Sequence, residues 1–151
     1  MGLNIQDLTI SSPDIESCTA IDPRFAGETG NEIPRLVITG VPADAVELAV
    51  IFHDPDAPLP HGFTHWTVYG IDPSTTEMGG EAVVGRTGPN GMGAAAYAGP
   101  QPPHGHGQHH YYFWVYALNR KVEGELSREE FLSSYADAIV EQNRLVGTYQ
   151  R

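Results

Sequence analysis

The sequence predicts a mainly β fold with one helix near its C-terminal end. Glycine and proline, 17 and 12 of the 151 residues, interrupt the apolar runs too often for long helices through most of the chain. Four apolar runs are rich in β-branched and aromatic residues and are bounded by Gly, Pro or Asp, which is typical of strands. The length is about that of one compact domain, so we expect a single domain over residues 1–151.

The four predicted strands cover residues 36–38, 46–52, 66–71 and 111–118. Side chains alternate between the two faces of a strand. In the last of these runs, alternation places His109, Tyr111 and Phe113 on one face and His110, Tyr112 and Trp114 on the other. Long polar loops separate the strands, and loops of this kind commonly carry binding residues.

The predicted helix is amphipathic and lies near residues 128–143. It begins with a capping box, in which the Ser127 hydroxyl faces a free backbone amide and the Glu130 side chain reaches back. Apolar residues and one glutamine then recur at spacings of three and four, at Phe131, Leu132, Tyr135, Ala138, Ile139 and Gln142. We expect this face to pack on the sheet.

Charge and cysteine content exclude several classes of partner and site. The formal net charge of −11 repels phosphate backbones and anionic membranes, so nucleic acid is not an expected partner. Cys18 is the only cysteine, which rules out an intramolecular disulfide and a thiolate zinc site. The sequence contains no signal-peptide pattern and no run of roughly 20 apolar residues, so we expect a cytoplasmic protein without a transmembrane segment.

Three polar blocks lie at the ends of predicted strands. In "DPDAP" two prolines hold Asp54 and Asp56 in an extended turn directly after an apolar run. In "HGFTHW" His65 begins the next strand. The third block, "PQPPHGHGQHHYY", gathers histidines ahead of the last strand.

The three blocks in this order, "DPDAP", "HGFTHWTVYGI" and "AGPQPPHGHGQHHYYFWVYALN", resemble the phosphatidylethanolamine-binding protein family. The closest likeness is to its short prokaryotic branch, which is called Raf kinase inhibitor-like. The resemblance runs from about residue 32 through "YALN" and more loosely to the closing "LVGTYQR". It implies a large central antiparallel sheet packed with a smaller sheet.

The resemblance also implies a small pocket for a phosphate-like, phospholipid-headgroup-like or carboxylate anion at one edge of the large sheet. Asp54 and Asp56 match the family's two aspartates, His65 matches its strand-opening histidine, and Phe63 takes an aromatic wall position. The remaining pocket positions fall on the glycine-proline loop and on the pattern His-x-Tyr-x-Phe, namely Gly99, Pro100, Gln101, Pro102, Pro103, His109 and Tyr111. Gln101 and His110 depart from residues common in the family, and nothing is carried over onto Tyr149.

The residues themselves limit how such a pocket would hold an anion. None of the three blocks contains lysine or arginine, so imidazole N–H groups, a tyrosine hydroxyl and backbone amides are the candidate donors. We hypothesise that Asp54 and Asp56 accept hydrogen bonds from His65 or His109 and raise the histidine pKa. The alternative is that both acids cap a turn, that both histidines are structural, and that Tyr111 is a core aromatic.

Three further interpretations stay open. A hydrolase of small esters or phosphoesters is conceivable through His and Asp acid-base chemistry, but the blocks offer no nucleophile beyond Thr64 and Thr67, so we expect no catalytic residue. His104 and His106 invite adventitious metal binding, but no dedicated metal site and no cofactor is expected. Like the family's kinase and protease inhibitors, the chain is a candidate regulator of a protein kinase or protease, and Tyr112 or Trp114 is a candidate surface for a homodimer.

Overall fold

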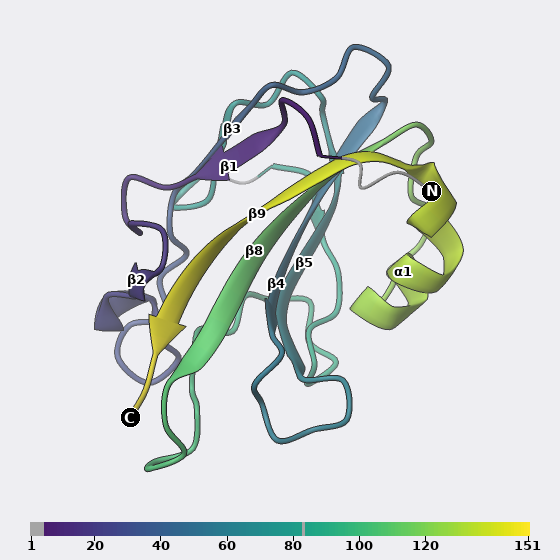
Figure 1. Cartoon of the computed structure of the whole chain (residues 1–151). Helices are drawn as coiled ribbons and strands as arrows, with labels where there is room; N and C mark the ends of the chain where they lie inside the picture. The colour runs from purple at the N-terminus through teal and green to yellow at the C-terminus, as the bar shows by residue number, and fades with distance from the viewer. Residues whose placement is uncertain (1–4, 83) are drawn as a thin grey trace.

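Two sheets form the body of the protein, as the sequence predicts. The computed structural model describes residues 5–82 and 84–151. The larger sheet has the strand order β2-β9-β8-β4-β5-β7, and the smaller has the order β1-β3-β6 (Figure 1). The paired strands run antiparallel, except that β2 runs parallel to β9 at one edge of the larger sheet. The mainly β prediction with a large and a small sheet is therefore confirmed.

The strands have the following bounds. In the larger sheet they are β2 (Thr19–Ala20), β4 (Glu47–Asp54), β5 (Phe63–Ile71), β7 (Arg86–Thr87), β8 (His109–Leu118) and β9 (Ile139–Tyr149). In the smaller sheet they are β1 (Thr9–Ser11), β3 (Leu36–Thr39) and β6 (Glu77–Met78). The four strands predicted from the sequence correspond to β3, β4, β5 and β8, whereas the short strands and β9 were not predicted.

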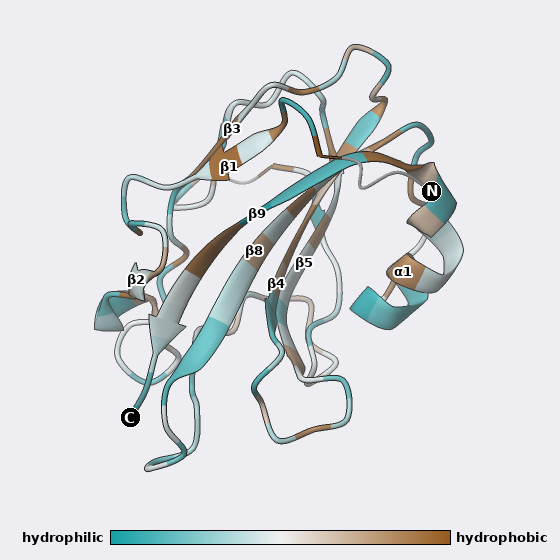
Figure 2. Cartoon of the chain, viewed as in Figure 1, coloured by the Kyte–Doolittle hydropathy of each residue, from teal (hydrophilic) through white to brown (hydrophobic). Residues whose placement is uncertain are grey.

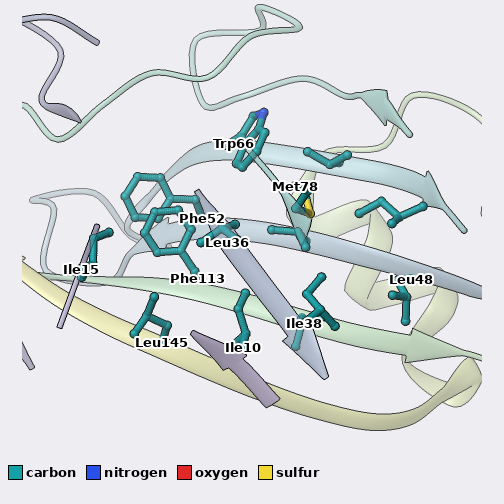
Figure 3. Close-up of a cluster of buried hydrophobic side chains, with 14 of the residues drawn as sticks. Ile10, Ile15, Leu36, Ile38, Leu48, Phe52, Trp66, Met78, Phe113 and Leu145 are labelled. Carbon is teal, nitrogen blue, oxygen red and sulfur yellow. The ribbon is translucent and has the colours of Figure 1, made fainter. Parts of the chain in front are cut away.

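Two apolar cores lie on the two faces of the larger sheet. Between the two sheets, Phe52 and Phe113 stack with their ring centroids 3.8 Å apart, and side chains from the smaller sheet such as Ile10 and Ile38 belong to the same core (Figure 3). On the other face, a smaller cluster joins the sheet to the helix through Phe131. Because β8 contributes to both cores, its alternating burial fixes which side chains face which layer.

The helix is shorter than predicted. α1 spans Arg128–Tyr135, a 3-10 turn follows at Ala136–Ala138, and residues from Ile139 onward belong to β9. The capping box is present, because Ser127 Oγ accepts from Glu130 N and Glu130 Oε1 accepts from Ser127 N. The prediction of a helix to residue 143 was wrong because β9 pairs with β8 along its whole length, and this pairing outweighs a local helical spacing.

No helix within residues 5–82 and 84–151 is both long enough and apolar enough to span a membrane. Figure 1 instead shows the single helix beside the sheet, with the C-terminus next to the loop that leads into β8. That neighbourhood, at the end of the sheet, is where the predicted site residues gather.

Candidate functional site

A cavity of about 390 Å³ lies at one end of the larger sheet. β4 ends there at Asp54, and its antiparallel neighbours β5 and β8 begin there at Phe63 and His109, so three strands present their termini to the same place. Figure 2 shows the change along β8, hydrophilic at its first residues and more hydrophobic further along. The volume falls within the range of about 300–1,000 Å³ typical of small-molecule sites.

The structure brings most of the predicted site residues together around this cavity. Nine of the eleven predicted residues line it, namely Asp54, Phe63, His65, Gly99, Gln101, Pro102, Pro103, His109 and Tyr111. Six lining residues were not predicted, namely Ala57, Pro58, Leu59, Met92, Ala98 and Arg151. Segments distant in sequence therefore meet at one place, as the resemblance implies.

A buried carboxylate and imidazole form the inner wall. His109 Nδ1 lies 2.7 Å from Asp54 Oδ2, and only 2% and 3% of the two side chains is exposed. Asp54 Oδ1 also accepts from the backbone N–H of Asp56 at 2.7 Å. Both oxygens of the carboxylate thus act as acceptors, which fixes a proton on His109 Nδ1.

His65 reaches the cavity through a β-bulge. Phe52 pairs with Trp66 and His53 pairs with Thr64, so His65 is an extra residue on β5 between the two pairs. Strict alternation would place His65 and Trp66 on opposite faces of the sheet. The bulge allows both side chains to face the smaller sheet and the cavity.

The partner of His65 differs from the hypothesis drawn from the sequence. Its Nδ1 lies 2.7 Å from the carbonyl oxygen of Ala98, and since a carbonyl only accepts, the proton is on Nδ1. Burial lowers the pKa of His65, so the ring is neutral near pH 7 with its Nε2 as an acceptor. The Asp54 charge acts to raise the pKa of His65, as expected, but desolvation by burial exceeds this effect and the net shift is downward.

Tyr111 supplies an unsatisfied polar atom. Its side chain is fully buried, and its hydroxyl has no hydrogen-bond partner among the residues that the structure describes. Burial raises the pKa of this hydroxyl, and so do the charge of Asp54 and the approach of the hydroxyl to the Asp54 carboxylate, which falls short of hydrogen-bond geometry, so the hydroxyl stays protonated. A buried hydroxyl without a partner costs free energy, and it lines the same cavity as His65 and His109.

Arg151 is the cation that the sequence interpretation missed. It lines the cavity, its Nε donates to the Pro102 carbonyl, and its Nη1 forms an ion pair with Glu28. Only 15% of its side chain is exposed. The interpretation considered cations within the three blocks alone, whereas β9 runs beside β8 and delivers the C-terminal end of the chain to the cavity, with Tyr149 paired to His109.

Two predicted site residues support the cavity without lining it. Asp56 accepts from both the backbone N–H and Nδ1 of His110, each at 2.8 Å, and so ties the start of β8 to the turn after β4. These contacts with His110 lower the pKa of Asp56 against the opposing effect of burial. The carbonyl of Pro100 accepts from Gly27 N at 3.0 Å.

Gly99 is needed for a close backbone approach. A Cβ at this position would lie 2.1 Å from the carbonyl oxygen of Phe25, a fixed backbone atom. Its N–H donates to Asn31 Oδ1 at 2.6 Å. Glycine therefore allows the loop that carries the cavity wall to lie directly on the segment around Phe25.

Among the described residues, the side chains that line the cavity include neither a metal-ligand cluster nor a serine, threonine or cysteine nucleophile. Within residues 5–82 and 84–151, no group of three or more His, Cys, Asp or Glu side chains is arranged to hold a metal ion. Thr64 lies 3.1 Å from His53 Nδ1 on the opposite face of the sheet, and Thr67 donates to the carbonyl of Pro89. Neither hydroxyl lines the cavity, and the lining residues include no serine or cysteine.

Comparison with known families gives a match over nearly the whole chain. The model of the phosphatidylethanolamine-binding protein family matches residues 11–150. The chain belongs to this family. Two proteins described as UPF0098 proteins are similar to it, at 37% identity over 78% of the chain for Pyrococcus horikoshii PH1269 and 31% over 97% for an Archaeoglobus fulgidus protein. The chain spans 64% and 52% of the lengths of these two relatives.

A third relative and two solved structures agree with this membership. A Mycobacterium tuberculosis protein named "Putative lipoprotein LppC" is 36% identical over 96% of this chain and 73% of its own length. The crystal structure of CT736, a phosphatidylethanolamine-binding protein homologue from Chlamydia trachomatis, superposes with a TM-score of 0.87, at 28% identity, over 98% of this chain and 99% of that one. Escherichia coli YbcL shares the fold at a TM-score of 0.87 and 24% identity, over 97% and 99% of the two chains.

Proposed function

We propose that the cavity binds a small organic anion, a phosphomonoester or carboxylate that carries an apolar group. The observation that carries this proposal is the buried Tyr111 hydroxyl, which lacks a partner and lines the same cavity as the Arg151 guanidinium. An oxyanion would accept from both and would relieve the cost of the unpaired hydroxyl. Family membership supports a binding role in general.

The histidines make anion binding dependent on protons. His65 and His109 each carry a proton on Nδ1, so a ring without a second proton can only accept a hydrogen bond at Nε2. An anion would favour a second proton on either ring, or would bring a proton of its own. Affinity should therefore increase as the pH falls from about 8 to about 6, because the anion and the proton bind together.

The mouth of the cavity supports an apolar substituent on the anion. Leu59 and Met92 lie on different loops at this mouth, and they are 54% and 69% exposed. Exposed apolar side chains beside a polar interior favour a ligand with one charged end and one apolar end.

Isothermal titration calorimetry with butyl phosphate tests the proposal. We expect saturable binding that weakens as the pH rises from about 6 to about 8. Arg151→Ala should lower the affinity about tenfold or more, because it removes the permanent cation of the cavity. Arg144→Ala is a matched control, since Arg144 lies over Tyr112 and Trp114 on the other face of the sheet and should leave the affinity unchanged. Absence of binding, or equal binding by Arg151→Ala, would contradict the proposal.

Other sequence-based predictions stay predictions. Regulation of a protein kinase or protease and a homodimer through Tyr112 or Trp114 need a partner to be identified. A cytoplasmic location also stays a prediction, since one similar protein carries the name of a lipoprotein. The hydrolase alternative lacks support from a hydroxyl or thiol nucleophile among the lining residues.

A further inference from the structure

His106 contacts the most buried imidazole of the site from outside the cavity. Its Nδ1 lies 2.7 Å from His109 Nε2, and the two ring centroids are 4.9 Å apart. His106 itself is exposed and does not line the cavity. From the sequence, His106 was a candidate only for adventitious metal binding and had no role at the anion site.

The proton on His109 determines the nature of this contact. Because Asp54 holds a proton on His109 Nδ1, the Nε2 of the neutral ring is an acceptor and His106 Nδ1 is the donor. Both nitrogens of His109 are therefore occupied, one by Asp54 and one by His106. An oxyanion can form a hydrogen bond with His109 Nε2 only if His106 leaves and a proton is added there.

The segment that carries His106 permits such a movement. Gly105 and Gly107 flank it with φ angles of 71° and 93°, and an added Cβ at either glycine would contact nothing within 4 Å. Glycine at both positions is therefore explained by the positive φ angle and not by a lack of space for a side chain. Among the described residues, the side-chain hydrogen bond of His106 is the one to His109, while the backbone is held by His106 N on the Pro103 carbonyl at 3.2 Å and by Gly105 N on the Arg151 carbonyl at 3.1 Å, so the side chain can turn away from His109 without breaking either backbone bond.

We propose that His106 is a latch that occupies His109 Nε2 in the ligand-free protein and is displaced when an anion binds. This inference rests on the proposed anion site and names a residue that limits its affinity. Displacement is favoured over joint binding because Nε2 offers a single hydrogen-bonding position and because the His106 ring lies outside the cavity lining.

Affinity measurements on His106→Ala test the latch. Butyl phosphate should bind His106→Ala about three- to tenfold more tightly than wild type, the factor that corresponds to one net hydrogen bond no longer broken. Gln108→Ala is the matched control, because Gln108 is exposed on the same loop and should leave the affinity unchanged. Weaker binding by His106→Ala would show that His106 contacts the ligand. Unchanged binding would show that His106 has no effect on affinity. Either result overturns the proposal.

A measurement without ligand separates the latch from the proposed function. In the ¹⁵N spectrum of the ligand-free protein, His106→Ala should shift the His109 Nε2 resonance and leave the Nδ1 resonance, which depends on Asp54, near its wild-type position. An unchanged Nε2 resonance refutes the latch whatever the ligand. If the resonance shifts but neither wild type nor His106→Ala binds butyl phosphate, the proposed function fails. The role of His106 in affinity is then refuted as well, although its contact with His109 is confirmed.

Discussion

Two consecutive residues at the end of β4 point to opposite faces of the larger sheet and have different surroundings. His53 points to one face, where its Nδ1 lies 3.1 Å from the Thr64 hydroxyl, and burial lowers its pKa to about 4. Asp54 points to the other face and meets His109 at the cavity. Both faces bury imidazoles, but only the cavity face combines them with the unpartnered Tyr111 hydroxyl.

This difference shows that burial of a histidine does not by itself identify a binding site. His53 and His65 both have a lowered pKa because both are desolvated. What distinguishes the face of His65 is a cavity with a cation and an unsatisfied hydroxyl at its wall. Matched substitutions on the two faces should therefore differ in their effects.

Removal of Asp54 should have the largest effect on stability. Asp54→Ala leaves His109 Nδ1 and the Asp56 N–H without an acceptor, and each unsatisfied buried group costs about 1–3 kcal/mol. We expect the free energy of unfolding to fall by about 3 kcal/mol. His53→Leu on the opposite face should cost about 1 kcal/mol, because it loses one hydrogen bond and keeps its apolar burial. Urea denaturation measures both, and equal losses would remove the distinction.

The stability of the protein should fall in acid through His53 and His65. Both have a lower pKa folded than the 6.5 of an unfolded histidine, so below about pH 6.5 the unfolded chain binds more protons. Each histidine contributes a slope of up to about 1.4 kcal/mol per pH unit, which for His53 continues down to about pH 4.

The two faces can be separated within this acid effect. His53→Leu should reduce the slope in denaturation series at successive pH values. Saturating butyl phosphate should reduce only the part that belongs to His65, because an anion in the cavity favours its charged ring. A slope that neither change alters would show that other groups carry the acid sensitivity.

Tyr111→Phe should stabilise the free protein and weaken ligand binding. Loss of an unpaired buried hydroxyl should raise the free energy of unfolding by about 1 kcal/mol, while affinity for butyl phosphate falls about fivefold. On the helix face, Tyr69 donates to the Leu126 carbonyl at 2.8 Å. Tyr69→Phe should therefore lose about 1 kcal/mol of stability and keep its affinity. Destabilisation by Tyr111→Phe would indicate a partner for that hydroxyl.

The smallest effect is expected at the mouth of the cavity. Met92→Ser should weaken butyl phosphate about threefold and leave inorganic phosphate unchanged, because only the alkyl group contacts the rim. Val46→Ser is the control, since Val46 is an exposed apolar residue away from this cavity. Equal weakening of both ligands, measured by calorimetry, would place Met92 in contact with the phosphate end.

The local parts of the fold could be predicted from the sequence. Composition identified β3, β4, β5 and β8, and alternation assigned His109 and Tyr111 to one buried face of β8. The capping box located the start of α1. These features depend on neighbouring residues only, so a single sequence contains the information.

The features that sequence reasoning missed depend on pairing between distant segments. β9 follows a helical spacing locally and becomes a strand because β8 needs a partner, which in turn brings Arg151 to the cavity. The bulge that turns His65 toward the cavity depends on the register between β4 and β5. The contact between His106 and His109 depends on the path of a glycine-containing loop, for which no local pattern exists.

A crystal structure of the protein soaked with butyl phosphate tests the central claim most directly. The account predicts phosphate density within hydrogen-bonding distance of the Tyr111 hydroxyl and the Arg151 guanidinium, the alkyl group near Leu59 and Met92, and the His106 ring moved away from His109. Phosphate bound only elsewhere on the surface, with the Tyr111 hydroxyl still without a partner, would contradict it.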